Sequence, residues 1–157
     1  LQLLWIDNND FQYDSSCVDN FSKIDSMSLG GAHSANNAFY YSPIVSSYVS
    51  QLSPHKQTKI KRFYADYENA FRLMSRLLKP RGSMVLTLGN RMVDRLEFPF
   101  IDVNKEIAQY YRLELIHVIN RNIIKKRMPV RVSRLSDGKP VDSMSKETVL
   151  LFRKGDH

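Results

Sequence analysis

A stripe of apolar and aromatic side chains, spaced three or four positions apart, constrains this chain more than any other feature. Such spacing places side chains on one face of a helix, so the sequence predicts a helix over residues 54–78. Ser53 is a suitable N-cap, and Pro54 suits the first helical position. Residues 79–82 (Lys-Pro-Arg-Gly) end the helix, because proline cannot continue it and glycine suits a left-handed turn. The stripe consists of Ile60, Phe63, Tyr64, Tyr67, Phe71, Met74, Leu77 and Leu78.

A short apolar segment follows this helix directly. Residues 84–88 stand between Gly82 and Gly89, a pattern typical of a strand that is buried on both faces. A helix, a buried strand, a second helix and two further strands indicate an α/β fold, of which this chain supplies half of an open, mixed sheet. The remaining predicted elements are a helix over residues 101–111 and strands over 113–119 and 148–153, the last of them antiparallel.

Open α/β sheets bind ligands in the crevice beyond the carboxyl ends of their strands. Gly89 and Asn90 lie at that edge and are the candidate substrate-pocket residues. The alternative is an ordinary turn, since a Gly-Asn pair suits positive φ.

Residues 1–52 form a loop-rich acidic and polar segment, interpreted as an insertion or recognition loop, and residues 53–157 form the second part. Periodicity leaves a short helix open over residues 44–52. Gly30 and Gly31 lie in a predicted loop; a phosphate cradle is the alternative, although the chain has neither a Walker lysine pattern nor G-x-G-x-x-G.

The charge is distributed unevenly along the 157 residues, a length that suits one domain. Residues 1–52 carry a net charge of −4 and residues 53–157 a net charge of +11. This asymmetry indicates a basic face, for which nucleic acid is a common partner and a solvated surface the alternative. The candidate DNA-backbone contacts are Lys125, Lys126, Arg127, Arg131 and Arg134.

Several function classes find no support in the sequence. One cysteine, Cys17, cannot form an internal disulfide, which fits a reducing, cytoplasmic location. No apolar run approaches the roughly 18–20 residues that span a bilayer. The four histidines are scattered, so we predict no metal site and no catalytic residues in this chain.

Several short motifs share one order and spacing with a known family. Residues 76–82 (Arg-Leu-Leu-Lys-Pro-Arg-Gly) precede a strand that ends Leu-Gly-Asn at 88–90. Phe-Pro-Phe-Ile-Asp follows at 98–102, and residues 125–129 and 146–154 complete the pattern. The chain thus resembles the carboxyl-terminal part of S-adenosylmethionine-dependent DNA amino-methyltransferases of the N4-cytosine/N6-adenine type. The resemblance implies the later half of a Rossmann-like methyltransferase sheet, S-adenosylmethionine as cofactor, DNA as substrate, and Asn90 near the target pocket.

Two motifs of that family have no counterpart here, namely the cofactor loop Phe-x-Gly-x-Gly and the catalytic turn [Asp/Asn/Ser]-Pro-Pro-[Tyr/Phe]. The expectation is that both are supplied upstream, by the amino-terminal half of the same enzyme, and that this chain alone is inactive. The alternatives are a basic module that binds nucleic acid without chemistry, and a partner subunit of a split methyltransferase.

Overall fold

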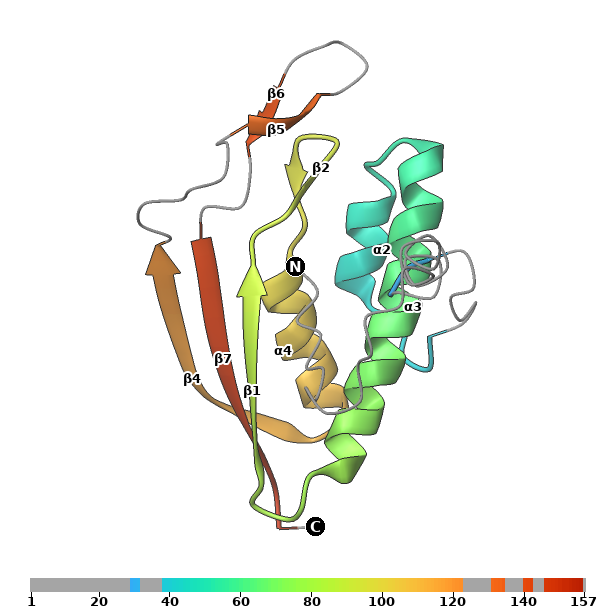
Figure 1. Cartoon of the computed structure of the whole chain (residues 1–157). Coiled ribbons are helices and arrows are strands. Elements are labelled where there is room, and N and C mark those ends of the chain that lie inside the picture. The colour runs from blue at the N-terminus through green and yellow to red at the C-terminus, as the bar shows by residue number, and fades with distance from the viewer. Residues whose placement is uncertain (1–28, 32–37, 123–130, 135–139, 143–145, 157) are drawn as a thin grey trace, which may run out of the picture.

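The computed structural model describes residues 29–31, 38–122, 131–134, 140–142 and 146–156 (Figure 1). These ranges form a mixed α/β structure with three helices, as the α/β prediction requires. The helices are α2 (Pro43–Val49), α3 (Pro54–Leu77) and α4 (Phe100–Tyr110); the strands are β1 (Ser83–Gly89), β2 (Met92–Val93), β3 (Leu96–Glu97), β4 (Leu113–Asn122), β5 (Arg131–Arg134), β6 (Pro140–Asp142) and β7 (Lys146–Lys154).

The main sheet has the strand order β1-β7-β4, and β7 is antiparallel to both neighbours. β1 and β4 therefore point the same way, with α4 in the connection between them (Figure 1). The predicted antiparallel last strand is confirmed. The β4–β7 register shifts between Leu115 and His117, where β4 is irregular.

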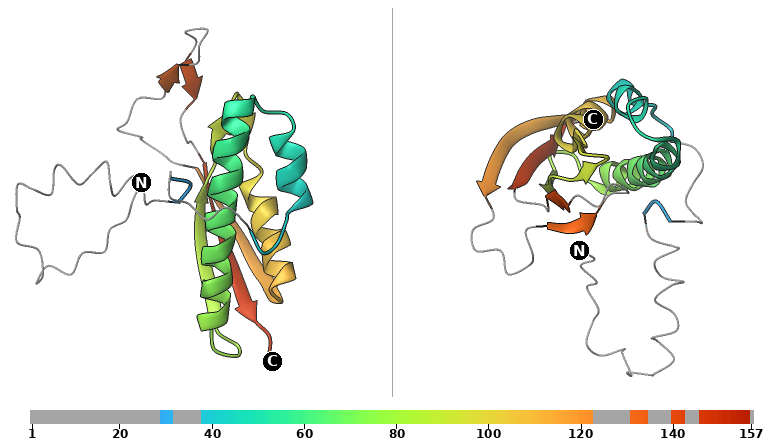
Figure 2. Two further views of the ribbon diagram at one scale, coloured as in Figure 1. Left: turned by 90° about the vertical axis from the view of Figure 1, so that its right-hand side faces the viewer. Right: turned by 90° about the horizontal axis from the view of Figure 1, so that it is seen from above.

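The helices lie on one side of this sheet, as the view from above shows (Figure 2). The side chains of Met84, Leu88, Leu150 and Phe152 point toward the helices and are buried in the main core. The prediction that residues 84–88 are buried on both faces is wrong, because Val85 is 60% exposed. No described element covers the outer face of the sheet.

Helix α3 begins and ends where its sequence predicts. Ser53 is the N-cap residue, but its hydroxyl makes no capping bond; its hydroxyl and its N–H both donate to Asp94, at 2.8 and 3.1 Å. After the helix, Arg81 adopts the left-handed conformation (φ 61°), and Gly82, for which we predict it, does not. Gly82 is needed instead for close packing, since a Cβ there would lie 2.7 Å from the Lys79 carbonyl oxygen.

Residues 38–52 pack against the same core as the later part of the chain. The helix left open over residues 44–52 is present as α2, with Ser42 as its N-cap. Two carboxylates hold the segment before it. The fully buried Glu68 accepts from the Phe39 N–H at 2.8 Å, and Glu106 accepts from the hydroxyls of Tyr40 and Ser42.

The long connection between β4 and β7 is not the uninterrupted loop that the sequence predicts. β4 continues to Asn122, and β5 pairs with β6 as an antiparallel two-stranded sheet. The figures place this hairpin beyond the ends of β4 and β1, away from the helices (Figures 1 and 2). Within the described ranges, no helix is both long enough and apolar enough to cross a membrane.

Candidate functional site

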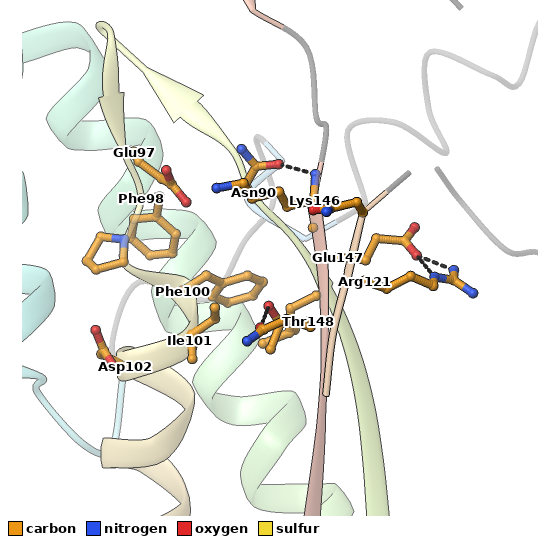
Figure 3. A pocket seen from close by; sticks show the side chains of 15 residues that line it. Asn90, Glu97, Phe98, Phe100, Ile101, Asp102, Arg121, Lys146, Glu147 and Thr148 are labelled. Atoms are coloured by element: carbon orange, nitrogen blue, oxygen red, sulfur yellow. Dashed lines mark hydrogen bonds and ion pairs between the residues drawn. The ribbon is translucent and has the colours of Figure 1, made fainter. Parts of the chain in front are cut away.

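A cavity of about 570 Å³ opens at the carboxyl ends of β1 and β4 (Figure 3). Four short segments line it: residues 88–90, 97–102, 120–122 and 146–148. The first and third end β1 and β4, the second leads into α4, and the fourth begins β7. The cavity therefore lies at the sheet edge where open α/β sheets bind ligands.

Both predicted pocket residues, Gly89 and Asn90, line this cavity. The Asn90 side-chain oxygen accepts a hydrogen bond from the Lys146 backbone N–H at 3.1 Å, and the backbone N–H of Asn90 donates to the Lys146 carbonyl at 3.2 Å. Neither Gly89 nor Asn90 has positive φ, so the left-handed turn considered for this pair is not formed. Asn90 instead ties the end of β1 to the start of β7.

A second polar contact joins β7 to β4 on the other side of β7 and forms part of the cavity wall. The Thr148 hydroxyl donates to the Asn120 side-chain oxygen at 2.9 Å, which the register of β4 and β7 makes possible by placing the two residues opposite each other. Arg121 and Glu147 form an ion pair next to it, with the arginine side chain 68% exposed. The wall thus presents amide and hydroxyl groups, with charge at its rim.

Aromatic rings form the opposite wall. Phe98 is buried and Phe100 half-buried, and their ring centroids lie 5.4 Å apart. Behind them, Tyr67 donates to Asn104 at 2.6 Å, and burial raises the pKa of this tyrosine above its usual value. Sequence reasoning did not single out these rings as site residues, although two phenylalanines flanking Pro99 directly before a helix were a signal for them.

The carboxylate nearest the start of α4 has a structural partner. Asp102 lines the cavity and lies in the first turn of α4, where a negative charge is favourable. Its side chain pairs with Lys105 at 3.1 Å on the exposed side of the helix. Asp102 is thus a helix-end charge in an ordinary ion pair.

The predicted DNA contacts are only partly described. Lys125, Lys126 and Arg127 lie outside the described residues, and Arg131 and Arg134 begin and end β5. β5 lies at the same end of the sheet as the cavity (Figure 1).

Other candidate chemistry finds no site in the part of the chain that the structure describes. No cluster of three or more His, Cys, Asp or Glu side chains occurs there that would hold a metal ion. The Gly30 N–H donates to the Asp66 carboxylate at 2.8 Å, so that amide is already occupied and does not form a phosphate cradle. His117 is exposed on β4, one of the two edge strands of the main sheet as described, and Cys17 lies outside the described residues.

No family model and no curated protein matches the chain. Among solved structures, it is similar to a proposed DNA modification methylase from Thermus thermophilus, with 16% sequence identity and a TM-score of 0.47. The likeness covers 72% of this chain and 51% of that one, so the chain spans about half the length of this relative. A likeness at this TM-score carries no conclusion about activity.

Proposed function

We propose that this chain is the carboxyl-terminal part of an S-adenosylmethionine-dependent DNA methyltransferase that methylates the exocyclic amino group of adenine or cytosine. The cavity contributes one side of the target-base pocket. The cofactor loop and the Pro-Pro-Tyr-type turn come from the amino-terminal half of the enzyme, so the chain alone is inactive.

The position of the cavity carries this proposal. The segment Leu-Gly-Asn at residues 88–90, on which the resemblance to amino-methyltransferases rests, ends β1 and lines the cavity. This is the edge at which open α/β sheets bind their ligands. By bonding to the backbone of Lys146, Asn90 fixes the distance between two of the strand ends that surround a bound base.

Methyl transfer to an exocyclic amine requires the nitrogen to be held in line with the methyl donor, and a base in duplex DNA must first leave the stack. In this proposal the residues of this chain position the target base and partly exclude water from it. The groups that polarise the amine belong to the upstream catalytic turn.

The described residues do not fit S-adenosylmethionine itself. The amide of Gly30 is taken by Asp66, and no glycine-rich turn among the described residues follows a strand and opens a helix. The cofactor site is therefore assigned to the amino-terminal half, and no step is derived through it.

DNA is the proposed partner of the basic segment between β4 and β7. Lys125, Lys126, Arg127, Arg131 and Arg134 belong to this segment, and β5 lies at the cavity end of the sheet (Figure 1). About four or five phosphate contacts would give a log–log salt slope near −4 for DNA binding. Reversing the charges at Lys125, Lys126 and Arg127 should flatten this slope, and an unchanged slope would remove the segment from the interface.

The free edge of β1 is the proposed contact with the amino-terminal half. Among the described strands β1 pairs with β7 alone, and it contains no charge and no proline, the usual protections of an edge strand. Val85, on the outer face of β1 beside this edge, is 60% exposed. Val85→Asp should weaken association with a separately produced amino-terminal half, whereas Thr58→Asp on the exposed side of α3 should not.

The test is methyl transfer by the intact protein. With labelled S-adenosylmethionine and DNA, digestion and mass spectrometry should find N6-methyladenine or N4-methylcytosine, and the 157-residue chain alone should yield neither. Asn90→Ala should lower kcat/KM about tenfold or more, because small displacements in a positioned site are costly. Gln109→Ala, exposed on α4, is the control. DNA binding by the intact protein without methyl transfer would favour the basic-module alternative.

A further inference from the structure

The ring of Phe100 is held in place from behind while it lines the cavity. Its centroid lies 4.7 Å from that of Tyr67, 5.4 Å from Phe98 and 5.8 Å from Phe63. Figure 3 shows Phe100 at the start of α4, between Phe98 and Thr148. A ring packed against three others has little freedom to turn, so the part of Phe100 that lines the cavity is held in one orientation.

Neutral polar side chains lie across the cavity from the rings, and the lining also includes charged residues, namely Glu97, Asp102, Arg121, Lys146 and Glu147. Thr148 and Asn120 bond to each other at 2.9 Å, and Asn90 lines the same cavity. The arginine of the Arg121–Glu147 pair extends into solvent at the rim. A flat aromatic wall opposite amide and hydroxyl groups suits a planar, uncharged heterocycle whose edge carries hydrogen-bond donors and acceptors, which describes a nucleobase.

We propose that Phe100 is the stacking platform for the base and that the Asn120–Thr148 pair faces its hydrogen-bonding edge. This inference rests on the proposed function, because it names the positioning residue of the same pocket. Phe100 acts by holding the base in place and takes no part in the proton or methyl transfer.

The experiment measures binding of two fluorescent nucleosides to the full 157-residue chain, namely 2-aminopurine deoxyriboside for adenine and pyrrolocytosine deoxyriboside for cytosine. Stacking quenches both probes. We expect Phe100→Leu to weaken binding about tenfold and to abolish quenching, since stacking on an aromatic side chain typically contributes several-fold to a hundredfold in affinity. Phe100→Tyr should retain both affinity and quenching.

Tyr110→Leu is the control, because it removes an exposed aromatic ring of α4 that neither lines the cavity nor packs against Phe100. It should change nucleoside affinity less than twofold, and circular dichroism should show both variants to be folded. Equal affinity for Phe100→Leu and the unaltered chain, an equal loss in Tyr110→Leu, or no binding of either probe to the unaltered chain would each overturn the inference. If nucleoside binding depends on Phe100 but the intact protein transfers no methyl group, the stacking role of Phe100 stands and the methyltransferase assignment is wrong.

Discussion

The two ends of the β1-β7-β4 sheet are built from different kinds of contact. At the closed end, where α3 turns into β1, backbone groups are paired tightly: the Gly82 N–H donates to Lys79 at 2.8 Å, and the Lys154 N–H donates to Gly82 at 2.9 Å. The Lys154 ammonium donates to the carbonyls of Ser75 and Leu78, both at 2.9 Å. These carbonyls lie at the carboxyl end of α3, where a cation is favourable.

At the open end, formed by residues 88–90, 120–122 and 146–148, side-chain hydrogen bonds supplement the backbone pairing of the strands. The Asn90–Lys146 and Asn120–Thr148 bonds join the strand ends, and a cavity of about 570 Å³ remains beside them. The comparison teaches that the fold is fixed at one end of the sheet, while the other end can carry a site whose side chains are replaceable at small cost in stability.

The largest effect is expected at the closed end from Gly82→Ala. The new Cβ would lie 2.7 Å from the Lys79 carbonyl oxygen, a backbone atom that cannot move away independently. Overpacking of this kind costs about 1–3 kcal/mol, measurable as a lower free energy of unfolding in urea. Gly155→Ala is the control, since nothing lies within 4 Å of its added Cβ. Equal stability of the two variants would mean that the turn is not tightly packed.

The next effect is expected from Lys154→Met, which keeps the length of the side chain but removes the ammonium that binds two carbonyls. Loss of charged hydrogen bonds at a helix terminus should lower the free energy of unfolding by about 1–2 kcal/mol. Arg153→Met, at the neighbouring exposed position of β7, should change it by less than about 0.5 kcal/mol. Equal losses for both substitutions would contradict the special role of the closed end.

Local pattern explains how much of this fold the sequence predicts. The stripe of α3 and the apolar segment of β1 are properties of neighbouring residues, so their bounds are nearly correct. The exposed outer face of β1 could not be predicted, because it depends on what lies on that side of the sheet. β5 and β6 were missed because the long basic segment that contains them shows no clear period.

The residues of the candidate site also divide into those that local sequence pattern predicts and those that it does not. Gly89 and Asn90 follow from one rule, that ligands bind beyond the strand ends. The Asn120–Thr148 pair joins residues 28 positions apart, and only the register of β4 and β7 brings them together. The role proposed for Phe100 could not be predicted from local pattern, because it depends on the rings that pack behind it in the folded structure.

A smaller effect is expected at the open end from Thr148→Val. The substitution keeps the volume of a buried side chain but removes the hydroxyl that donates to Asn120. Because Asn120 is exposed and water can replace this donor, the loss in the free energy of unfolding should be about 0.5–1 kcal/mol. Thr87→Val, exposed on β1, is the control. A loss above that of Gly82→Ala would overturn the contrast between the two ends.

The smallest effect concerns Asp94, whose carboxylate accepts hydrogen bonds from the hydroxyl and the N–H of Ser53 and thereby links the β2–β3 turn to the start of α3. The bond from the Ser53 hydroxyl, followed by that from its N–H, lowers the pKa of Asp94. A lowered pKa in the folded state means that this stabilisation is present above the unfolded value near 3.9 and is lost as the pH falls through the folded value.

Because the hydrogen bonds between Ser53 and Asp94 are exposed to solvent, their contribution at pH 7 should be below about 0.5 kcal/mol. The measurement compares the free energy of unfolding of the unaltered chain with that of Asp94→Asn at pH 7 and again well below about pH 3.9. The difference should shrink toward zero at the lower pH, and Ser53→Ala should reduce it at pH 7. A difference that does not change with pH would mean that the charge of Asp94 does not stabilise this contact, and that the link between the β2–β3 turn and α3 depends on packing alone.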